Sequence, residues 1–560
     1  MLIFKKNNMK TISKKNNMKN IYIILLLSLF TMTSCNDDYL EKLPLDKISD
    51  SSFWQSGADV QMYANQFYPT LFDARIAWYD TDNFSDNQTP TSRNSYTWNE
   101  YPIPSTGGGW AKSDWLNIRS CNYALDRIAK MKSDPSVLNA EGEIRFFKSF
   151  YYFQKVRKFG DVPWLSTSLD LESAELQAPR DSRKTVVENM IKDLDFAIAN
   201  LPETSSADRL TKYAALALKA EICLYEGTFR KYHNVVGGHE AMLRLAATSY
   251  ESIINSGRFS VYSTGQPTKD YFDLFVKYDL KGNPEGIMVQ RFIANKRMHN
   301  NVRQLGEPYT GYNIDFVQSY LCKDGLPIAI SPLYKGDAAF ADEFVDRDPR
   351  MAQSIYNTVR PYNIATNGVT YYKPMPEFQS NYCPTSYFII KGYSPLEVDR
   401  LPSTSTTNDF IYRYGNILVS YAEVKAELGE CTQVILDKSV NLLRARVGMP
   451  ALKVNVEFVD PNWPKWEVPV IALINEIRRE RRLEISAEGK RWDDLVRWKA
   501  GKLLENPKTL QGARDPKTGT YRVLYPGYTA RKWDDKLYLY PIPAQELALN
   551  TKLTQNPGWK

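Results

Sequence analysis

The segment INEIRRERRLEISAEGKRWDDLVRW, residues 474–498, carries a regular pattern of charge. Its glutamates recur every four residues, at Glu476, Glu480, Glu484 and Glu488, and four arginines lie between them. Opposite charges three or four residues apart share one face of an α-helix and stabilise it by about 0.2–0.5 kcal/mol per pair. The pattern therefore predicts a helix held together by ion pairs along its own surface. Two glutamates one turn apart also have the spacing of an acid–base pair, but nothing else in the segment suggests a substrate cleft, so a structural role is favoured.

Helical periodicity marks two regions of the chain, one on each side of an irregular middle. Apolar residues recur at i, i+3 or i+4 and i+7 in residues 110–131, 140–160, 185–201, 210–227 and 239–257, and again in 410–429, 434–450 and 468–504. Gly227 and Gly257 are natural helix stops. Residues 258–407 contain short extended runs, turns and prolines, and such a long irregular region is usually functional. We expect a mainly α fold, in which tetratricopeptide-like helical hairpins form a scaffold and a variable loop-rich subdomain carries short strands.

The N-terminal residues indicate secretion. An apolar run from Ile21 to Phe30 is too short to span a membrane, which takes about 20 residues, but it suits the core of a signal peptide. Small and polar residues then lead to Cys35, so we expect residues 1–34 to be a signal peptide. The block KKNNMK occurs twice upstream, and the simplest explanation is that Met18 is the true initiator.

Composition excludes several classes of function. The formal net charge is +7, but residues 1–34 hold six lysines and no acidic residue, so residues 35–560 carry a net charge of only +1. A nearly neutral protein has no overall attraction for polyphosphate, so we expect no nucleic-acid partner. The five cysteines beyond Cys35 show no CxxC or zinc-like spacing, and only three histidines occur. We therefore expect no metal site, no cofactor and no histidine-based catalysis.

Several segments, taken in order, resemble the RagB/SusD family of nutrient-uptake lipoproteins from the outer membrane of Bacteroidetes. The strongest signature is residues 474–498, with Glu488-Gly489, Arg491-Trp492 and Arg497-Trp498. The other matching segments are DYLEKLPLDKISDSSFW (38–54), RFFKSFYYFQKVRKFGDVPW (145–164), YRYGNILVSYAEVKAELG (412–429), VNLLRARVGMP (440–450) and LYLYPIPAQELALNTKLTQNPGW (537–559). Residues 258–407 match only loosely. The resemblance implies an N-terminal region at 35–257, a variable ligand-face region at 258–407 and a C-terminal helical region at 408–560.

The resemblance also implies a location. Met32 to Cys35 resembles a bacterial lipobox, in which Cys35 carries the lipid, and an ordinary signal peptide with a chance cysteine is the alternative. Asp37 and Asp38 resemble the export signal of surface lipoproteins. A multiply acylated cysteine holds a soluble domain stably on a membrane. We expect a lipid-anchored protein of the outer membrane that faces the cell exterior.

Proteins of this family sit over a TonB-dependent transporter and capture oligosaccharides, or less often peptides, for import. The resemblance therefore implies a glycan-binding protein that is not an enzyme and that delivers its ligand to a TonB-dependent (SusC-like) porter. Two alternatives stay open. One is a peptide-binding protein of the same architecture, and the other is a glycoside hydrolase whose carboxylates lie in the irregular middle.

A glycan site combines exposed aromatic rings, which cover the apolar faces of sugars, with polar side chains that bind the hydroxyl groups. Residues 77–110 fit this description best, because aromatic residues lie there among turn formers without a helical period. Residues 309–313 (YTGYN) and 362–372 are similar. The candidate ligand-binding residues are Trp78, Tyr79, Asn83, Tyr96, Trp98, Asn99, Tyr101, Tyr309 and Tyr312. The alternative is that these rings pack the loops onto the scaffold.

Trp98 is the sharpest of these predictions. It is flanked by polar and aromatic residues and has no apolar partner at helical spacing. We therefore expect an exposed ring on which a sugar stacks.

Overall fold

The computed structural model describes residues 50–73, 80–132, 134–205, 208–378, 381–462 and 464–560. The residues outside this description include the predicted signal peptide, Cys35, Asp37, Asp38, Trp78 and Tyr79. The chain divides into two units, Met1–Gln55 and Ser56–Lys560. In the first unit the described residues hold one short helix, α2 (Asp50–Phe53). The second unit contains the helices and sheets that build the site.

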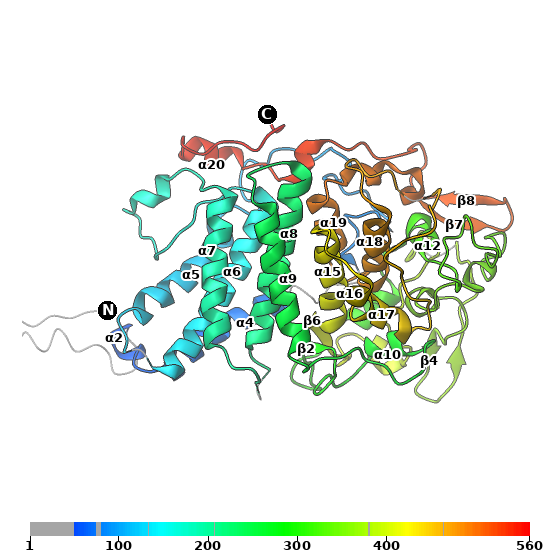
Figure 1. The fold of residues 1–560 in the computed structure, drawn as a ribbon, viewed down its shortest axis with the longest axis horizontal. Coiled ribbons are helices and arrows are strands. Elements are labelled where there is room, and N and C mark those ends of the chain that lie inside the picture. The colour runs from blue at the N-terminus through cyan, green and yellow to red at the C-terminus, as the bar shows by residue number, and fades with distance from the viewer. Residues whose placement is uncertain (1–49, 74–79, 133, 206–207, 379–380, 463) are drawn as a thin grey trace, which may run out of the picture. The chain divides into compact units, whose positions relative to one another are not determined.

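Antiparallel helices form the first part of Ser56–Lys560. They are α3 (Gly57–Ala64), η2 (Asn65–Phe67), α4 (Tyr68–Asp73), α5 (Lys112–Ile128), α6 (Pro135–Phe159), η4 (Ala174–Gln177), α7 (Arg183–Asn200), α8 (Lys212–His233) and α9 (His239–Asn255). Short connections join α5 to α6 and α8 to α9, and Figure 1 shows α5 to α9 side by side. The prediction of a mainly α fold with helical hairpins is confirmed.

One predicted helix end is wrong and has a clear reason. The helix expected to stop at Gly227 continues to His233. Gly227 instead allows α9 to lie close to α8, because a Cβ atom at this position would lie 2.8 Å from Cγ of Leu243. The stop expected at Gly257 is confirmed, since α9 ends at Asn255 and Gly257 has a φ of 65°.

A second group of helices occupies the middle of the unit (Figure 1). It comprises α15 (Tyr414–Glu427), α16 (Gln433–Asp437), α17 (Val440–Arg446), α18 (Ala472–Glu484) and α19 (Arg491–Arg497). Within it, α15 packs against both α9 and α18, and α19 packs against α8. The C-terminal helices therefore lie directly on the N-terminal helical hairpins.

Short elements and loops make up the rest. The described strands form two-stranded antiparallel sheets that pair β1 (Gln88–Pro90) with β3 (Thr310–Tyr312), β2 (Gly286–Gln290) with β6 (Asp409–Arg413), β4 (Asn363–Ile364) with β5 (Thr370–Tyr371), and β7 (Gln511–Asp515) with β8 (Thr520–Val523). The short helices are α10 (Asp270–Leu274), α11 (Asn301–Gly306), α12 (Ile314–Ser319), η5 (Asp342–Phe344), α13 (Met351–Ser354), α14 (Glu397–Arg400), η6 (Gly501–Glu505), η7 (Pro507–Leu510), η8 (Asp535–Tyr538) and α20 (Ala544–Leu549). The first two sheets tie together segments that lie far apart in the sequence.

The charged residues of α18 are buried, and two of its glutamates, Glu480 and Glu484, pair with arginines of other segments. Glu484 accepts hydrogen bonds from Arg446 at 2.7 Å, from Arg413 at 2.9 Å and from Arg350 at 3.1 Å. All four side chains are at most 1% exposed. Burial by itself would raise the pKa of Glu484, but the three guanidinium groups hold it well below its usual range. The carboxylate is therefore ionised and shared by three elements.

The arginines of α18 behave in the same way. Arg481 donates to Asp494 of α19 at 2.8 Å, and Arg482 donates to Asp315 of α12 at 2.8 Å. The prediction of a helix held together mainly by ion pairs along its own surface is wrong for these residues. Because neighbouring segments surround α18, most of its charges have partners on other segments; Glu476 and Arg479 still pair along the helix itself, at 3.1 Å.

Two arginines fix the segment that leads into β1. Arg491 donates to the carboxylate of Asp86 at 2.7 and 2.8 Å, and Arg482 donates to the backbone carbonyl of the same residue at 2.8 Å. These two cations overcome the effect of burial and lower the pKa of Asp86. Asp86 lies two residues before β1, so the charge network of α18 also sets the position of that strand.

Replacing Glu484 by Gln tests the structural role of this network. We expect Glu484→Gln to lower the free energy of unfolding by about 3–5 kcal/mol, because three buried arginines lose their shared countercharge. Urea unfolding followed by circular dichroism measures the change. Glu240→Gln is the matched control, since Glu240 pairs with Arg244 on the exposed face of α9 and should leave the unfolding midpoint unchanged. Equal midpoints for the two variants would contradict the assignment.

Candidate functional site

Trp98 lies in a buried cluster and not on the surface. Its side chain is 8% exposed and packs with Leu510 and Tyr525. The Trp98 ring meets Tyr525 and Tyr528 edge-on, at centroid distances of 5.6 and 5.0 Å. The prediction of an exposed ring is therefore wrong. Its packing partners come from residues more than 400 positions later in the chain, so no pattern near Trp98 in the sequence could reveal them.

Tyr96 and Tyr101 also belong to the packing. Tyr96 is 2% exposed, donates its hydroxyl to the carbonyl of Leu537 at 2.7 Å and stacks on Tyr540 at 3.9 Å. Tyr101 is half-buried and lies edge-on to the same two rings, at 5.5 and 5.9 Å. Burial of Tyr96 contradicts its prediction as an exposed platform, and the reason is again the C-terminal segment that covers it.

Three other candidates have structural contacts. Tyr312 is 0% exposed, because β3 runs through the core and the ring stacks on Phe316 at 4.3 Å. The prediction of an exposed ring is therefore wrong for Tyr312 as well. Asn83 accepts a hydrogen bond from the Thr310 hydroxyl at 2.5 Å. Asn99 has a φ of 57°, the left-handed conformation in which asparagine often serves as a turn residue.

Tyr309 is the predicted residue that the structure brings to a pocket. The pocket has a volume of about 290 Å³ and is lined by Pro90, Thr91, Tyr309, Asn381, Pro384, Arg522 and Leu524. The backbone N–H of Thr91 donates to the carbonyl of Tyr309 at 2.8 Å, which extends the pairing of β1 and β3 up to the pocket. Tyr309 is 53% exposed and has a φ of 50°, a conformation that costs a non-glycine residue energy and is common at functional sites.

The side chains around Tyr309 supply the remaining chemistry. The ring of Tyr382 lies edge-on to it at 5.3 Å. Arg522, on β8, donates one N–H to the carbonyl of Phe378 at 2.5 Å, and Asn381 adds an amide group. No acidic residue is among the described residues that line the pocket. The site can therefore stack a flat apolar face against tyrosine and donate hydrogen bonds to oxygen atoms.

Trp98 supports this pocket from behind. It packs on Tyr525, whose hydroxyl donates to the carbonyl of Pro90 in the lining. Arg93 lies over the rings of Trp98 and Tyr528, at 4.8 and 4.5 Å. The predicted segment is thus close to the site, although its tryptophan does not line it.

Sequence reasoning missed Asn381, Tyr382 and Arg522. The first two lie in SNYCPTS (380–386), where an aromatic residue stands among turn formers, the same signal that singled out residues 77–110. Arg522 had no such signal, because it lies on the short strand β8 (Thr520–Val523), outside the segments singled out for their aromatic residues. In the third predicted tract, Tyr371 and Tyr372 are 53% and 56% exposed at the end of the β4–β5 hairpin.

The glutamates of residues 474–498 have no free carboxylate for catalysis. Glu476, Glu480, Glu484 and Glu488 are at most 6% exposed, and each is paired with at least one cation. The structural interpretation of this segment therefore holds over an acid–base pair. Among the residues that the structure describes, no three His, Cys, Asp or Glu side chains are grouped to hold a metal ion.

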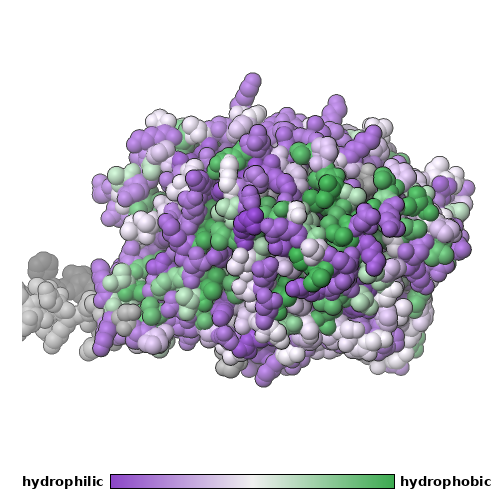
Figure 2. Space-filling view, viewed as in Figure 1, coloured by the Kyte–Doolittle hydropathy of each residue, from purple (hydrophilic) through white to green (hydrophobic). Residues whose placement is uncertain are grey.

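Figure 2 shows hydrophobic residues on one face of the protein as separate patches among hydrophilic ones. Within the part of the chain that the structure describes, none of the helices has the length and apolar character needed to cross a membrane.

Comparison with known proteins adds a family. A model described as the SusD family matches residues 260–559, and a model described as "Starch-binding associating with outer membrane" matches residues 5–224. SusD-like protein P38 of Formosa agariphila is 26% identical over 503 residues, which cover 86% of this chain and 91% of that protein. The starch-binding protein SusD of Bacteroides thetaiotaomicron is 24% identical over 271 residues, or 43% of this chain and 48% of that protein.

Solved structures share the fold. A SusD-like protein from Bacteroides fragilis superposes with a TM-score of 0.72 at 24% identity, and the match covers 92% of this chain and 100% of that chain. These matches confirm the resemblance found in the sequence.

Replacing Trp98 by Ala distinguishes a packing residue from a ligand platform. We expect Trp98→Ala to lower the free energy of unfolding by about 3–5 kcal/mol, the usual cost of removing a buried aromatic ring. Tyr309→Ala is the matched control, because a half-exposed ring contributes little to the fold. Chemical denaturation of both variants measures the difference. If the Trp98→Ala protein is as stable as Tyr309→Ala, the assignment of Trp98 as a buried packing residue is contradicted.

Proposed function

Because this chain belongs to the SusD family, we propose that it binds an oligosaccharide at the pocket of Tyr309 and does not catalyse a reaction. The observation that carries the proposal is the exposed ring of Tyr309, held in a left-handed backbone conformation beside Asn381 and Arg522. A sugar presents an apolar C–H face to such a ring and its hydroxyl groups to the amide and guanidinium. The described residues of the lining supply these two kinds of contact.

The scaffold supports binding by keeping the pocket rigid before the ligand arrives. Tyr309 is fixed on one side by the β1–β3 pairing and on the other by Tyr382. Arg522 lies on β8, which pairs with β7, and the backbone N–H of Leu524, directly after β8, donates to the carbonyl of Leu510 at 3.1 Å. A site that is already ordered loses less conformational entropy on binding, so even a small pocket can bind specifically.

We further propose that the protein is anchored to the outer membrane through a lipid on Cys35 and faces the cell exterior. The sequence around Cys35 and the description of the family model that matches residues 5–224 support this location. A TonB-dependent (SusC-like) porter is the proposed partner that receives the glycan. Asp37 and Asp38, directly after the anchor, are the proposed export signal.

Tyr309→Ala tests the binding site. We expect its affinity for the tightest ligand from an oligosaccharide array to fall by about 5- to 150-fold, equivalent to ~1–3 kcal/mol, with an unchanged melting temperature. Tyr278→Ala is the matched control, since its ring is 46% exposed and lies outside this pocket and outside the predicted tracts. Isothermal titration calorimetry compares the two variants with the wild type.

Three results would count against the proposal. Equal affinities of Tyr309→Ala and wild type would remove the pocket from glycan binding. Binding of a peptide pool without any glycan would favour the peptide-binding alternative. Release of shortened products from the oligosaccharides at catalytic amounts of protein would favour a glycoside hydrolase.

Cys35→Ala tests the anchor. We expect this variant to leave the outer-membrane fraction for a soluble or unprocessed pool, because the acyl chains hold the domain on the membrane. Fractionation in high salt, in cells that lack the porter, measures the change. A Cys35→Ala protein that still sediments with the outer membrane would contradict the prediction, and Cys431→Ala is the control for loss of a cysteine elsewhere.

A further inference from the structure

A second and larger pocket lies among the helices. It has a volume of about 540 Å³, within the range of about 300–1,000 Å³ that is common for small-molecule sites. Its lining residues come mainly from α6, α8 and the segment that begins α19, and it shares no residue with the pocket of Tyr309. The proposed glycan site therefore leaves this pocket unexplained.

Aromatic rings form much of its wall, and other rings hold them from behind. Tyr540 stacks on the buried Tyr96 at 3.9 Å. Trp492 meets Phe84 edge-on at 6.2 Å and Tyr96 at 6.0 Å. Phe153, at 4% exposed, closes the side formed by α6. These rings are fixed by the core, so the wall is ordered without a ligand.

The carboxylates of the lining already have partners. Lys490 pairs with Glu221, and Arg157 pairs with Asp493. Glu488 is bound by Lys391 and Arg413, both at 2.6 Å. Each negative charge in the lining is therefore neutralised by a neighbouring cation.

Lys158 is different. Its ammonium group lies 4.6 Å from the centre of the Tyr540 ring, and the described residues place no carboxylate in ion-pair contact with it. Burial lowers its pKa more than the nearby carboxylate of Asp114 raises it, so the charged form is poorly solvated. An anion delivered to this position would compensate for the lost solvation.

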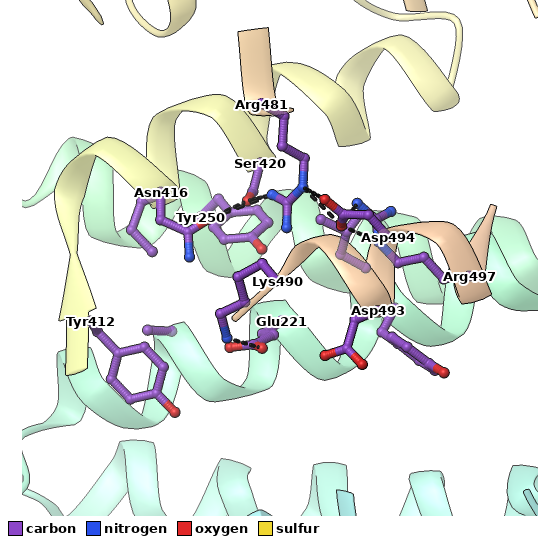
Figure 3. Close-up of a pocket in the computed structure, with 14 residues that line it drawn as sticks. Glu221, Tyr250, Tyr412, Asn416, Ser420, Arg481, Lys490, Asp493, Asp494 and Arg497 are labelled. Atoms are coloured by element: carbon purple, nitrogen blue, oxygen red, sulfur yellow. Dashed lines mark hydrogen bonds and ion pairs between the residues drawn. The ribbon is translucent and has the colours of Figure 1, made fainter. Parts of the chain in front are cut away.

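A smaller cavity behind the pocket limits how deeply a ligand can enter. It has a volume of about 30 Å³, enough for water but not for a sugar. Glu221, Tyr412, Lys490 and Asp493 line both spaces. Figure 3 shows Lys490 joined to Glu221 on one side of this cavity and Arg481 joined to Asp494 on the other. The Lys490–Glu221 pair thus forms the inner wall of the larger pocket.

We propose that the larger pocket is a second ligand site, which binds one carboxylate-bearing sugar with its ring against Tyr540 and Trp492 and its carboxylate at Lys158. The aromatic wall accounts for the sugar ring, and the one lining cation without an ion-pair contact among the described residues accounts for a single negative charge. Gln154, exposed on α6, supplies an amide for the hydroxyl groups. This site does not depend on the pocket of Tyr309.

The test is calorimetric titration of the full folded protein with D-glucuronate, D-galacturonate and N-acetylneuraminate. Neutral D-glucose and inorganic phosphate serve as reference probes. We expect saturable binding of at least one of the three acids, no binding of glucose, and at least a tenfold loss of affinity in Lys158→Met. Lys158→Arg keeps the charge and should retain binding within about threefold. Lys192→Met removes an exposed lysine of α7 and should bind as the wild type does.

Four outcomes would overturn the proposal. They are the absence of saturable binding for all three acids, an unchanged affinity in Lys158→Met, loss of binding in Tyr309→Ala, and phosphate binding as tight as that of the sugar acids. The third would place the acid in the other pocket, and the fourth would leave an anion site without sugar recognition. If Lys158→Met fails to fold, Gln154→Ala provides the second variant. An unchanged affinity of Gln154→Ala for the sugar acid, together with loss of binding in Lys158→Arg, would overturn the proposed binding geometry.

Discussion

The buried carboxylate of Glu484 is the interaction on which the rest of the structure depends. It accepts hydrogen bonds from arginines of three other segments, Arg350, Arg413 and Arg446, with all four groups excluded from water. A buried charge is tolerated only when its partners are in place, because removing one partner leaves the others desolvated and unpaired. These four groups must therefore come together when the protein folds. The network therefore joins the loop-rich middle, which supplies Arg350, to the end of β6, which supplies Arg413, and to α17, which supplies Arg446.

The same network also fixes the strands next to the pocket of Tyr309. Arg482 and Arg491 hold Asp86, which fixes the start of β1, and β1 pairs with β3 up to Tyr309. The exposed tyrosine therefore lies at the end of a continuous series of contacts that begins inside the helical core. This explains how a loop residue can keep a costly left-handed conformation, since the surrounding contacts over-determine its position.

The sequence was informative where structure is local and uninformative where it is not. Helical periodicity predicted the hairpins because each apolar stripe depends on neighbours three and four residues away. The burial of Trp98 and Tyr312 was missed, because Trp98 packs on residues after 509 and β3 threads the core of a distant region. Charge alternation in residues 474–498 predicted a helix but not its partners, since alternation is the same whether the charges pair along the helix or across to other elements.

The aromatic residues of 94–101 lie behind the walls of two pockets and do not form their surfaces. Trp98 lies behind Tyr525, which contacts the pocket of Tyr309, whereas Tyr96 lies behind Tyr540, which lines the larger pocket. One turn thus supports both candidate sites from the inside. Aromatic residues in a polar, turn-rich segment can therefore serve to support the rings that line a pocket. Their composition alone does not distinguish this supporting role from direct contact with a ligand.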